Sequence, residues 1–268
     1  MNVPYISNTI LLQNNTFSGL NLRQNLIVLD EVSSTNDYLK ELLSNIKPLA
    51  EGTAIMAKHQ TNGKGQRGNT WLTTPNENLS MSLLLYPSDL LIQHAFNLNM
   101  VICLGVQQWL KRYIKDVYIK WPNDIFVGRK KIGGILIENQ LKGKTVKSSI
   151  VGIGININQQ DFPASLSKLA TSLKLNLRST EPLSVEHCCL EMLSEIFTLY
   201  KQSNLTNSQN IRAAYTASLF QLGKVGLFEI NGKQTEGIIQ GIDSVGRLIV
   251  LINESTQSFD LKEIRFLI

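Results

Sequence analysis

The stretch KHQTNGKGQRGNTW, residues 58–71, constrains the fold of this chain more than any other. Its glycines Gly63, Gly65 and Gly68 have the spacing of a dinucleotide-binding fingerprint. That fingerprint requires a helix that begins inside it, whereas residues 69–75, NTWLTTP, are poor helix formers. The sequence therefore argues against a Rossmann nucleotide site and predicts a loop that leaves one strand and leads to another.

Residues 63–68, the glycine loop, have the composition of a ligand-binding loop. Glycine has no side chain to hold a ligand away from the backbone, so the chain can approach it closely. Lys64 and Arg67 would then face phosphate or carboxylate oxygens. A second candidate, Gly143-Lys144-Thr145, resembles the end of a P-loop, but Glu138 stands where that motif needs glycine. We therefore predict a basic hairpin turn at 143–145.

Apolar residues that alternate with polar ones predict strands, and apolar residues that recur every three or four positions predict helices. The strands are expected at 26–29, 53–59, 79–86, 117–121, 125–127, 132–141 and 149–157. Helices are expected from Ser34, whose spacing to Asp37 is typical of a capping box, and at 93–114, 165–169, 184–201 and 207–218. These elements predict an α+β fold in which helices flank a mixed, mostly antiparallel sheet.

The sequence pattern changes at Gly223. Short strands separated by hairpin turns are expected at 225–230, 235–242, 248–252 and 258–266. A segment of this length and pattern predicts a small closed β-barrel. We expect two domains, residues 1–222 and 223–268.

A second polar cluster follows the long helix. Lys120-Trp121-Pro122-Asn123-Asp124 ends a strand, because Pro122 lacks an N–H group and restricts the residue before it. Lys131 and Gly133-Gly134 come directly after it in the next hairpin. We expect this cluster and the glycine loop to form one site.

The three cysteines, Cys103, Cys188 and Cys189, show no metal or disulfide spacing, which predicts reduced thiols. His187-Cys188-Cys189 has the look of a metal ligand set, but it lies in an apolar-periodic helix and is expected to be core. The sequence shows no signal peptide and no run of apolar residues of membrane-spanning length. We therefore expect a cytoplasmic protein that does not use a membrane.

Taken together, the motifs resemble those of the biotin protein ligases (biotin–acetyl-CoA-carboxylase ligases). The matching segments follow one another in family order from about residue 30 to 160: Ser34-Thr35-Asn36, Gln60, the glycine loop with Trp71, KWPND at 120–124, KIGGI at 131–135 and GIGIN at 152–156. The resemblance implies a class II synthetase-like catalytic core of the biotin–lipoate ligase kind and a Src-homology-3-like C-terminal barrel. It also implies the monofunctional class, because residues 1–25 are too short for the family's DNA-binding domain.

The resemblance further implies a two-step reaction. Biotin and MgATP form biotinyl-5′-AMP, and the biotinyl group then passes to a lysine of a biotin carboxyl carrier domain. The residues it assigns to biotin are Ser34, Thr35, Asn36, Gln60, Lys64, Gly65, Gln66, Lys131 and Gly134. Those assigned to ATP are Lys64, Gln66, Arg67 and Asn156, and those assigned to catalysis are Lys120, Asp124, Lys131 and Arg67, with Asp124 also a Mg²⁺ ligand.

Two positions depart from the family pattern. Arginines of the best-known members are replaced here by Lys64, which keeps the charge without the planar fork, and by Gln66, which is neutral. The departures concern the strength of phosphate contacts and leave the reaction type unchanged.

The net charge of +5 suits an anionic ligand and an acidic carrier protein, and no Lys/Arg block is dense enough to imply DNA binding. A homodimer is left open. Three other functions compete with biotin ligation: lipoate or octanoate ligation, a non-catalytic biotin sensor or repressor, and an interaction module whose barrel binds peptides.

Overall fold

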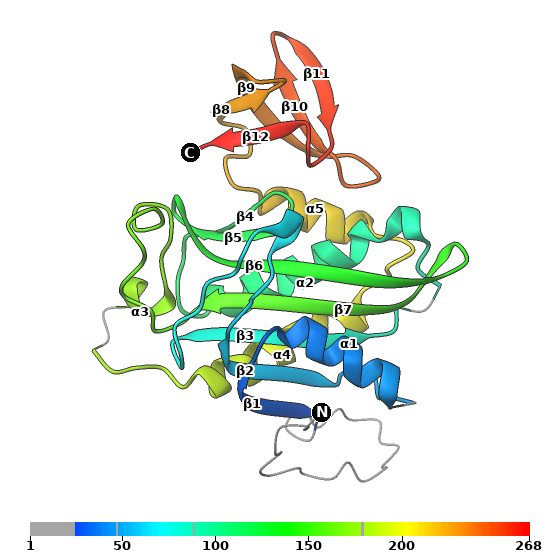
Figure 1. Ribbon diagram of the computed structural model, residues 1–268. Helices are drawn as coiled ribbons and strands as arrows, with labels where there is room; N and C mark the ends of the chain where they lie inside the picture. The colour runs from blue at the N-terminus through cyan, green and yellow to red at the C-terminus, as the bar shows by residue number, and fades with distance from the viewer. Residues whose placement is uncertain (1–24, 47, 88, 178–179) are drawn as a thin grey trace.

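The computed structural model describes residues 25–46, 48–87, 89–177 and 180–268, apart from the side chain of Arg67. The expectation that residues 1–25 contain no DNA-binding domain falls almost entirely outside these ranges. Within them, a seven-stranded sheet and five α-helices form one unit, and a five-stranded sheet forms a second unit joined to it by a short connection (Figure 1).

The larger sheet has seven strands in the order β1-β2-β3-β7-β6-β5-β4. Their bounds are β1 Leu26–Val32, β2 Ala54–Gln60, β3 Asn78–Leu85, β4 Val117–Lys120, β5 Asp124–Val127, β6 Lys130–Lys142 and β7 Thr145–Asn156. Only β1 and β2 run parallel among these described strands, and every other neighbouring pair is antiparallel. The predicted mixed, mostly antiparallel sheet is therefore confirmed.

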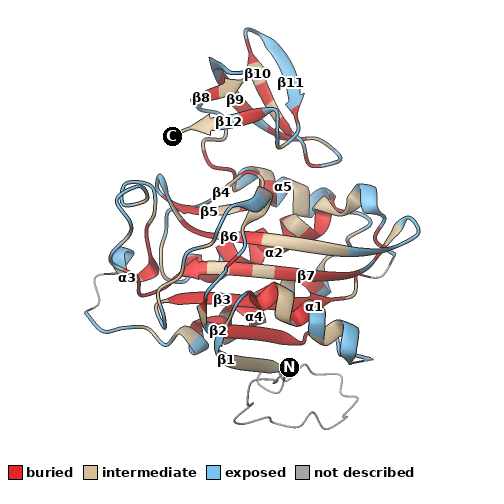
Figure 2. Ribbon diagram, viewed as in Figure 1, coloured by how far each residue is buried: buried red, intermediate tan, exposed pale blue. Residues whose placement is uncertain are grey.

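Helices cover both faces of this sheet. Helices α2 (Phe96–Lys111) and α4 (Val185–Gln202) pack on one face, and α1 (Thr35–Asn45) packs on the other. The alternation along β3 explains this arrangement, because Leu79, Met81 and Leu83 enter the large core while Leu84 enters the smaller core under α1. Figure 2 shows the central strands buried and the outer turns of α1 exposed.

The polar residues of β3 decide where a ligand can bind. Ser80 and Ser82 alternate with the apolar residues of the large core, so they point to the face that α1 covers only in part. Ser82 pairs with Gly152 of β7, and Ser80 pairs with Gly154. A face lined by serine and glycine is open and polar, unlike the apolar face under α2.

The remaining helices are shorter. They are α3 (Leu173–Asn176) and α5 (Gln209–Ala217), with one-turn 3₁₀ helices at Gln66–Gly68 and Ile92–His94. The helix that contains His187-Cys188-Cys189 is α4, in which both cysteines are buried and His187 is exposed. The interpretation of that sequence as part of a core helix is confirmed.

The C-terminal residues form a separate antiparallel sheet. Its strands are β8 Val225–Ile230, β9 Lys233–Ile242, β10 Leu248–Ile252, β11 Ser255–Phe259 and β12 Ile264–Leu267, in the order β11-β10-β9-β8-β12. Phe228, Leu248 and Val250 are fully buried in it. This sheet is consistent with the expected Src-homology-3-like unit, and the boundary at residues 222 and 223 stays a prediction.

The two sheets are held together by the turn between β9 and β10. The backbone carbonyl of Gly246 accepts a hydrogen bond from Trp121 Nε1 at 2.9 Å. A Cβ atom at Gly246 would lie only 2.2 Å from the ring of Phe96. Arg212 of α5 donates to the carbonyl oxygens of Asp243 and Ser244 in the same turn. The C-terminal sheet therefore contacts the strand end that carries Lys120-Trp121.

Two expected elements are wrong. The predicted helix at 165–169 is a series of turns, which ends where the carbonyl of Leu169 accepts from the N–H of Lys131 at 2.8 Å. The predicted strand at 258–266 is two strands, β11 and β12, separated by a turn. The strand expected at 149–157 is present but begins earlier, at Thr145.

Candidate active site

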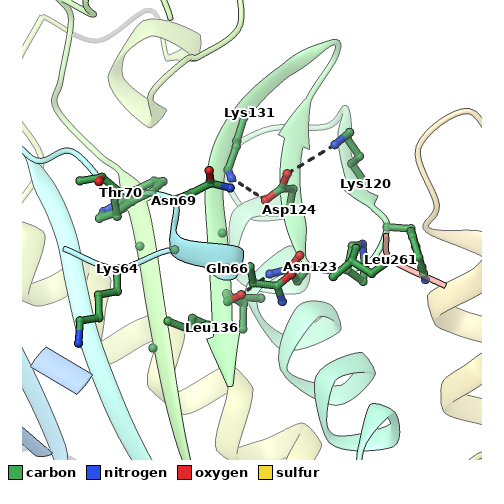
Figure 3. A pocket seen from close by; sticks show the side chains of 18 of the residues that line it. Lys64, Gln66, Asn69, Thr70, Lys120, Asn123, Asp124, Lys131, Leu136 and Leu261 are labelled. Carbon is green, nitrogen blue, oxygen red and sulfur yellow. Dashed lines mark hydrogen bonds and ion pairs between the residues drawn. The ribbon is translucent and has the colours of Figure 1, made fainter. Parts of the chain in front are cut away.

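A cleft of about 670 Å³ lies between the open face of the larger sheet and the C-terminal sheet. The larger sheet, α1 and the glycine loop supply most of its lining. The C-terminal sheet closes one side with residues of β8, the β8–β9 turn and β12, including Glu229, Asn231 and Arg265. Figure 3 shows Lys120 and Leu261 together on this side of the cleft.

One end of the cleft is a cluster of buried hydrogen-bonding side chains, here called the polar corner: Thr35, Asn36, Gln60 and Ser82. Gln60 Oε1 accepts from the backbone N–H of Thr35 at 2.8 Å and lies 3.0 Å from its hydroxyl. Ser82 Oγ lies 2.8 Å from Thr35 Oγ1 and donates to Asn36 Oδ1 at 2.5 Å. Buried groups of this kind can match a ligand that carries both donors and acceptors.

Local sequence explains how the polar corner is assembled. Ser34 caps α1 by accepting from the N–H of Asp37 at 3.4 Å, as its spacing predicts, and this fixes Thr35 and Asn36 in the first turn. Gly152 leaves room for Asn36, because a Cβ atom there would lie 2.4 Å from Asn36 Oδ1. Any larger residue at 152 would displace the amide.

The other end of the cleft carries the cation cluster, which consists of Lys120, Asp124 and Lys131. Asp124 Oδ1 lies 2.6 Å from Lys131 Nζ, and its Oδ2 lies 3.6 Å from Lys120 Nζ (Figure 3). The register of the sheet brings them together, since Asp124 pairs with Lys120 on one side and with Gly134 on the other. With two ammonium groups around one carboxylate, the cluster keeps a net positive charge.

Lys120 is the most enclosed of the three. Its ammonium lies 4.9 Å from the centre of the Phe266 ring and 5.6 Å from that of Phe126. Burial lowers the pKa of Lys120 below its ordinary value, the charge of Lys131 lowers it further, and Asp124 opposes both. An anion that enters the cleft would relieve this unfavourable burial of charge.

The glycine loop forms the rim of the cleft and brings Trp71 over the sheet. The loop closes on itself, with the N–H of Gly65 bonded to the carbonyl of Asn69 at 2.7 Å. Gly68 has a φ of +79°, a conformation that favours glycine. Trp71 lies against Gly154, where a Cβ atom would be 2.4 Å from the indole. Trp71 Nε1 and Ser80 Oγ are buried without a partner among the described residues.

The cleft brings together most of the residues predicted from the sequence. Its lining includes Ser34, Thr35, Asn36, Gln60, Lys64, Gly65, Gln66, Lys120, Asp124, Lys131 and Gly134. Lys64 lines the rim but pairs with Asp37 at 2.6 Å and points away from the cation cluster. Arg67 lies on the turn of the glycine loop, and its side chain is outside the described structure.

Asn156 lies outside the cleft lining. Its carbonyl oxygen accepts from Asn78 at 2.9 Å, and its amide nitrogen donates to the carbonyl of Thr171 at 2.9 Å. Both ends of the side chain therefore hold β7 to its neighbours, and the contact of Asn156 with a nucleotide stays a prediction.

Sequence reasoning missed several side chains of the site. Ser82 completes the polar corner, and the alternation of β3 is the signal that could have indicated it. Phe266 contacts Lys120 from the far end of the chain, and no local pattern reports such a pairing. Asn123 is part of KWPND but has no predicted role, and its side-chain Nδ2 holds this segment to β6 by donating to the backbone carbonyl of Ile135.

The residues present fit a protein-held Mg²⁺ ion poorly. Both oxygens of Asp124 face ammonium groups, so a metal ion at this carboxylate would have to displace Lys131. The described residues contain no group of three or more His, Cys, Asp or Glu side chains placed to hold a metal. No step is therefore assigned to a Mg²⁺ ion bound by Asp124.

The fold and the cleft define an α+β ligand-binding protein in which a polar corner and a cation cluster share one cavity. Residues 28–156, just under half of the chain, match the model of the Biotin/lipoate A/B protein ligase family. The described part of the chain has no helix long and apolar enough to cross a membrane.

Three relatives illustrate the similarity. A biotin protein ligase from Aquifex aeolicus, solved with biotin and ATP, superposes with a TM-score of 0.73 and 28% identity, over 91% of this chain and 99% of that one. A biotin–[acetyl-CoA-carboxylase] ligase from Paracoccus denitrificans is 28% identical over 228 residues, covering 83% of this chain and 92% of that protein. The bifunctional ligase/repressor BirA of Bacillus subtilis strain 168 is 41% identical over 153 residues, 56% of this chain.

That last alignment covers 46% of the bifunctional protein, so the chain spans about half the length of this curated relative.

Proposed function

We propose that the chain is an ATP-dependent ligase that activates biotin as biotinyl-5′-AMP and transfers it to a lysine of a biotin carboxyl carrier domain. The observation that carries the proposal is the placement of the polar corner and the cation cluster in one cleft. The similarity to the Aquifex aeolicus biotin protein ligase over nearly the whole of both chains supports it.

The polar corner suits the ureido head of biotin. A ureido ring presents N–H donors and a carbonyl acceptor, and Thr35, Gln60 and Ser82 supply hydroxyl and amide groups that can pair with them. A lipoyl ring has neither N–H groups nor a ring carbonyl, so it would leave buried polar groups without partners.

The cation cluster suits the activation of a carboxylate by ATP. The biotin carboxylate and the ATP phosphates repel one another, and the net positive charge of Lys120, Asp124 and Lys131 offsets that repulsion as they approach. One well-placed donor of this kind contributes roughly 3–4 kcal/mol to a transition state. In this proposal Mg²⁺ arrives as the complex with ATP.

The walls of the cleft protect the product. A mixed anhydride such as biotinyl-5′-AMP hydrolyses in water, so an enclosed site favours its survival. The glycine loop and Trp71 form one wall, and the C-terminal sheet forms the opposite one. A loop that orders over a bound ligand would complete the enclosure.

Biotin-dependent exchange of labelled pyrophosphate into ATP tests the first half-reaction, with lipoate as the matched control. We expect exchange with biotin and none with lipoate. Exchange with lipoate alone would keep adenylation and overturn the substrate. Transfer to a purified carrier domain, followed by mass spectrometry of the modified lysine, tests the second half-reaction.

A further inference from the structure

Glu138 of β6 contacts the polar corner without lining the cleft, and the proposed mechanism does not use it. Its Oε2 accepts from Asn36 Nδ2 at 2.6 Å, and its Oε1 lies 2.5 Å from Lys40 Nζ. Asn36 is buried, whereas the side chains of Lys40 and Glu138 keep 38% and 32% of their surface exposed. The carboxylate therefore joins a surface ammonium to a buried amide.

This contact fixes the orientation of the Asn36 amide. An ionised carboxylate only accepts hydrogen bonds, so the NH₂ end of Asn36 must face Glu138. The oxygen end then faces Ser82 Oγ at 2.5 Å. A serine hydroxyl can donate or accept, so Ser82 alone could not decide between the two amide orientations.

The fixed amide leaves the polar corner short of one proton. Three oxygen–oxygen contacts link Asn36, Ser82, Thr35 and Gln60 in a row, at 2.5, 2.8 and 3.0 Å. Only two hydroxyl protons, those of Ser82 and Thr35, are available for them. The oxygen of Gln60 cannot turn away without leaving the N–H of Thr35, which it accepts at 2.8 Å.

Counting protons shows which atom is left free. Ser82 gives its proton to Asn36, since that contact is the shortest and the amide oxygen cannot donate. The proton of Thr35 then goes either to Ser82 or to Gln60. In both cases the hydroxyl oxygen of Thr35 accepts no hydrogen bond from within the polar corner, so its lone pairs are available to a ligand.

We infer that Glu138 is a positioning residue that acts through Asn36 and makes Thr35 an acceptor for ligand N–H groups. The inference rests on the proposed function, because it describes how the same cleft selects its substrate. A ligand head with N–H donors fits this polarity, and a head without them does not. Glu138 thereby contributes to the choice of a ureido ring without touching it.

The substitution Glu138→Gln tests the inference because Lys40 dictates how the new amide lies. The ammonium of Lys40 can only donate, so the new amide beside it turns its oxygen to Lys40 and its NH₂ to Asn36. Asn36 must then rotate and donate to Ser82. Ser82 donates to Thr35, Thr35 donates to Gln60, and one of the lone pairs that Thr35 offers is lost. We expect biotin to bind about tenfold more weakly, in isothermal titration without ATP.

The double variant Lys40→Met/Glu138→Gln supplies the decisive comparison. Without the ammonium, the new amide is free to turn its oxygen to Asn36, and biotin affinity should return to within about threefold of the unchanged protein. Lys40→Met alone should also stay within about threefold, because Glu138 still accepts from Asn36. A merely structural role of Glu138 would not produce such a rescue.

The possible outcomes separate the two proposals. Equal biotin affinity for Glu138→Gln and the unchanged protein would overturn the inference and leave the proposed function standing. A double variant that binds biotin no better than Glu138→Gln would also overturn it. Absence of biotin binding by the unchanged protein would overturn the proposed function, and the inference with it. Thermal unfolding of each variant confirms that the compared proteins are folded.

Discussion

Asp124 Oδ1 lies 2.6 Å from Lys131 Nζ, and this ion pair holds the ammonium of Lys131 inside the cleft, beside the backbone of Gly134. The pair joins the start of β5 to the start of β6, two neighbouring strands of the same hairpin. Lys131 is 37% exposed, so its charge remains accessible to a ligand. The first prediction follows from this position.

We expect Lys131→Ala to reduce biotinyl-adenylate formation about a hundredfold or more, because it removes a cation that stabilises the charge of the reacting groups. Pyrophosphate exchange at saturating biotin and ATP measures the effect. Lys130→Ala is the matched control, since Lys130 is the neighbouring residue on β6 but is exposed outside the cleft. Near-normal exchange by Lys131→Ala would remove this residue from the catalytic set.

Lys120 gives a prediction about stability and pH. Burial disfavours its charged form, so the pKa of Lys120 is lower in the folded protein than in the unfolded chain. Between that lowered pKa and about 10.4, the unfolded chain binds more protons than the folded protein. The contribution of Lys120 to the free energy of unfolding therefore rises with pH through this interval.

The comparison protein is Lys120→Met, which keeps the length of the side chain and cannot titrate. Urea unfolding at pH values of about 7 and about 10 should show the unchanged protein gaining stability relative to this variant. Parallel behaviour of the two proteins over that range would mean that the pKa of Lys120 is the same in the folded and unfolded states.

The parts of the site that the sequence predicted depend on short segments. The Ser34 cap, the glycine loop and KWPND each place their residues through local backbone geometry, and all three contribute to the cleft. Asp124 and Lys131 lie only a few residues apart in one hairpin, so their closeness in space could also be inferred from the sequence. The conformation of such short segments is set by interactions between residues that are close in the sequence, so the sequence alone can predict it.

The parts that sequence could not predict depend on partners distant in the chain. Lys64 is expected to bind phosphate because it is a cation in the glycine loop, but its ammonium pairs with Asp37 of α1. Asn156 belongs to a motif of the resemblance, yet its amide is used by Asn78 and Thr171. Which partner a polar side chain selects depends on the packing of whole elements, and single-sequence patterns do not contain that information.

The contact between Trp71 and Gly154 gives a third prediction. A Cβ atom at position 154 would lie 2.4 Å from the indole, so Gly154→Ala must displace Trp71 from the sheet. We expect at least a tenfold loss of ligand affinity, with destabilisation of about 1–3 kcal/mol from overpacking. Biotin and ATP titrations measure the first effect, and thermal unfolding measures the second.

A size-compensating variant distinguishes the clash from a general defect. In Trp71→Leu/Gly154→Ala the smaller side chain leaves room for the added methyl group, so stability should recover while ligand affinity stays low. If the double variant is as unstable as Gly154→Ala, the contact between the two residues does not explain the destabilisation.

The hydrogen bond from Trp121 Nε1 to the carbonyl of Gly246 gives the last prediction, which concerns the C-terminal sheet as a wall of the cleft. Trp121→Phe removes this buried donor and leaves the carbonyl unpaired, which should cost about 1–3 kcal/mol. If the contact also holds the C-terminal sheet against the cleft, adenylation should fall more than biotin binding, because Phe266 would move away from Lys120.

Trp109→Phe is the control, since Trp109 is equally buried but donates to Glu191 on the far face of the sheet. Equal losses of adenylation in the two variants would show that stability alone is affected. A loss of adenylation confined to Trp121→Phe would mean that the C-terminal sheet keeps Lys120 in place.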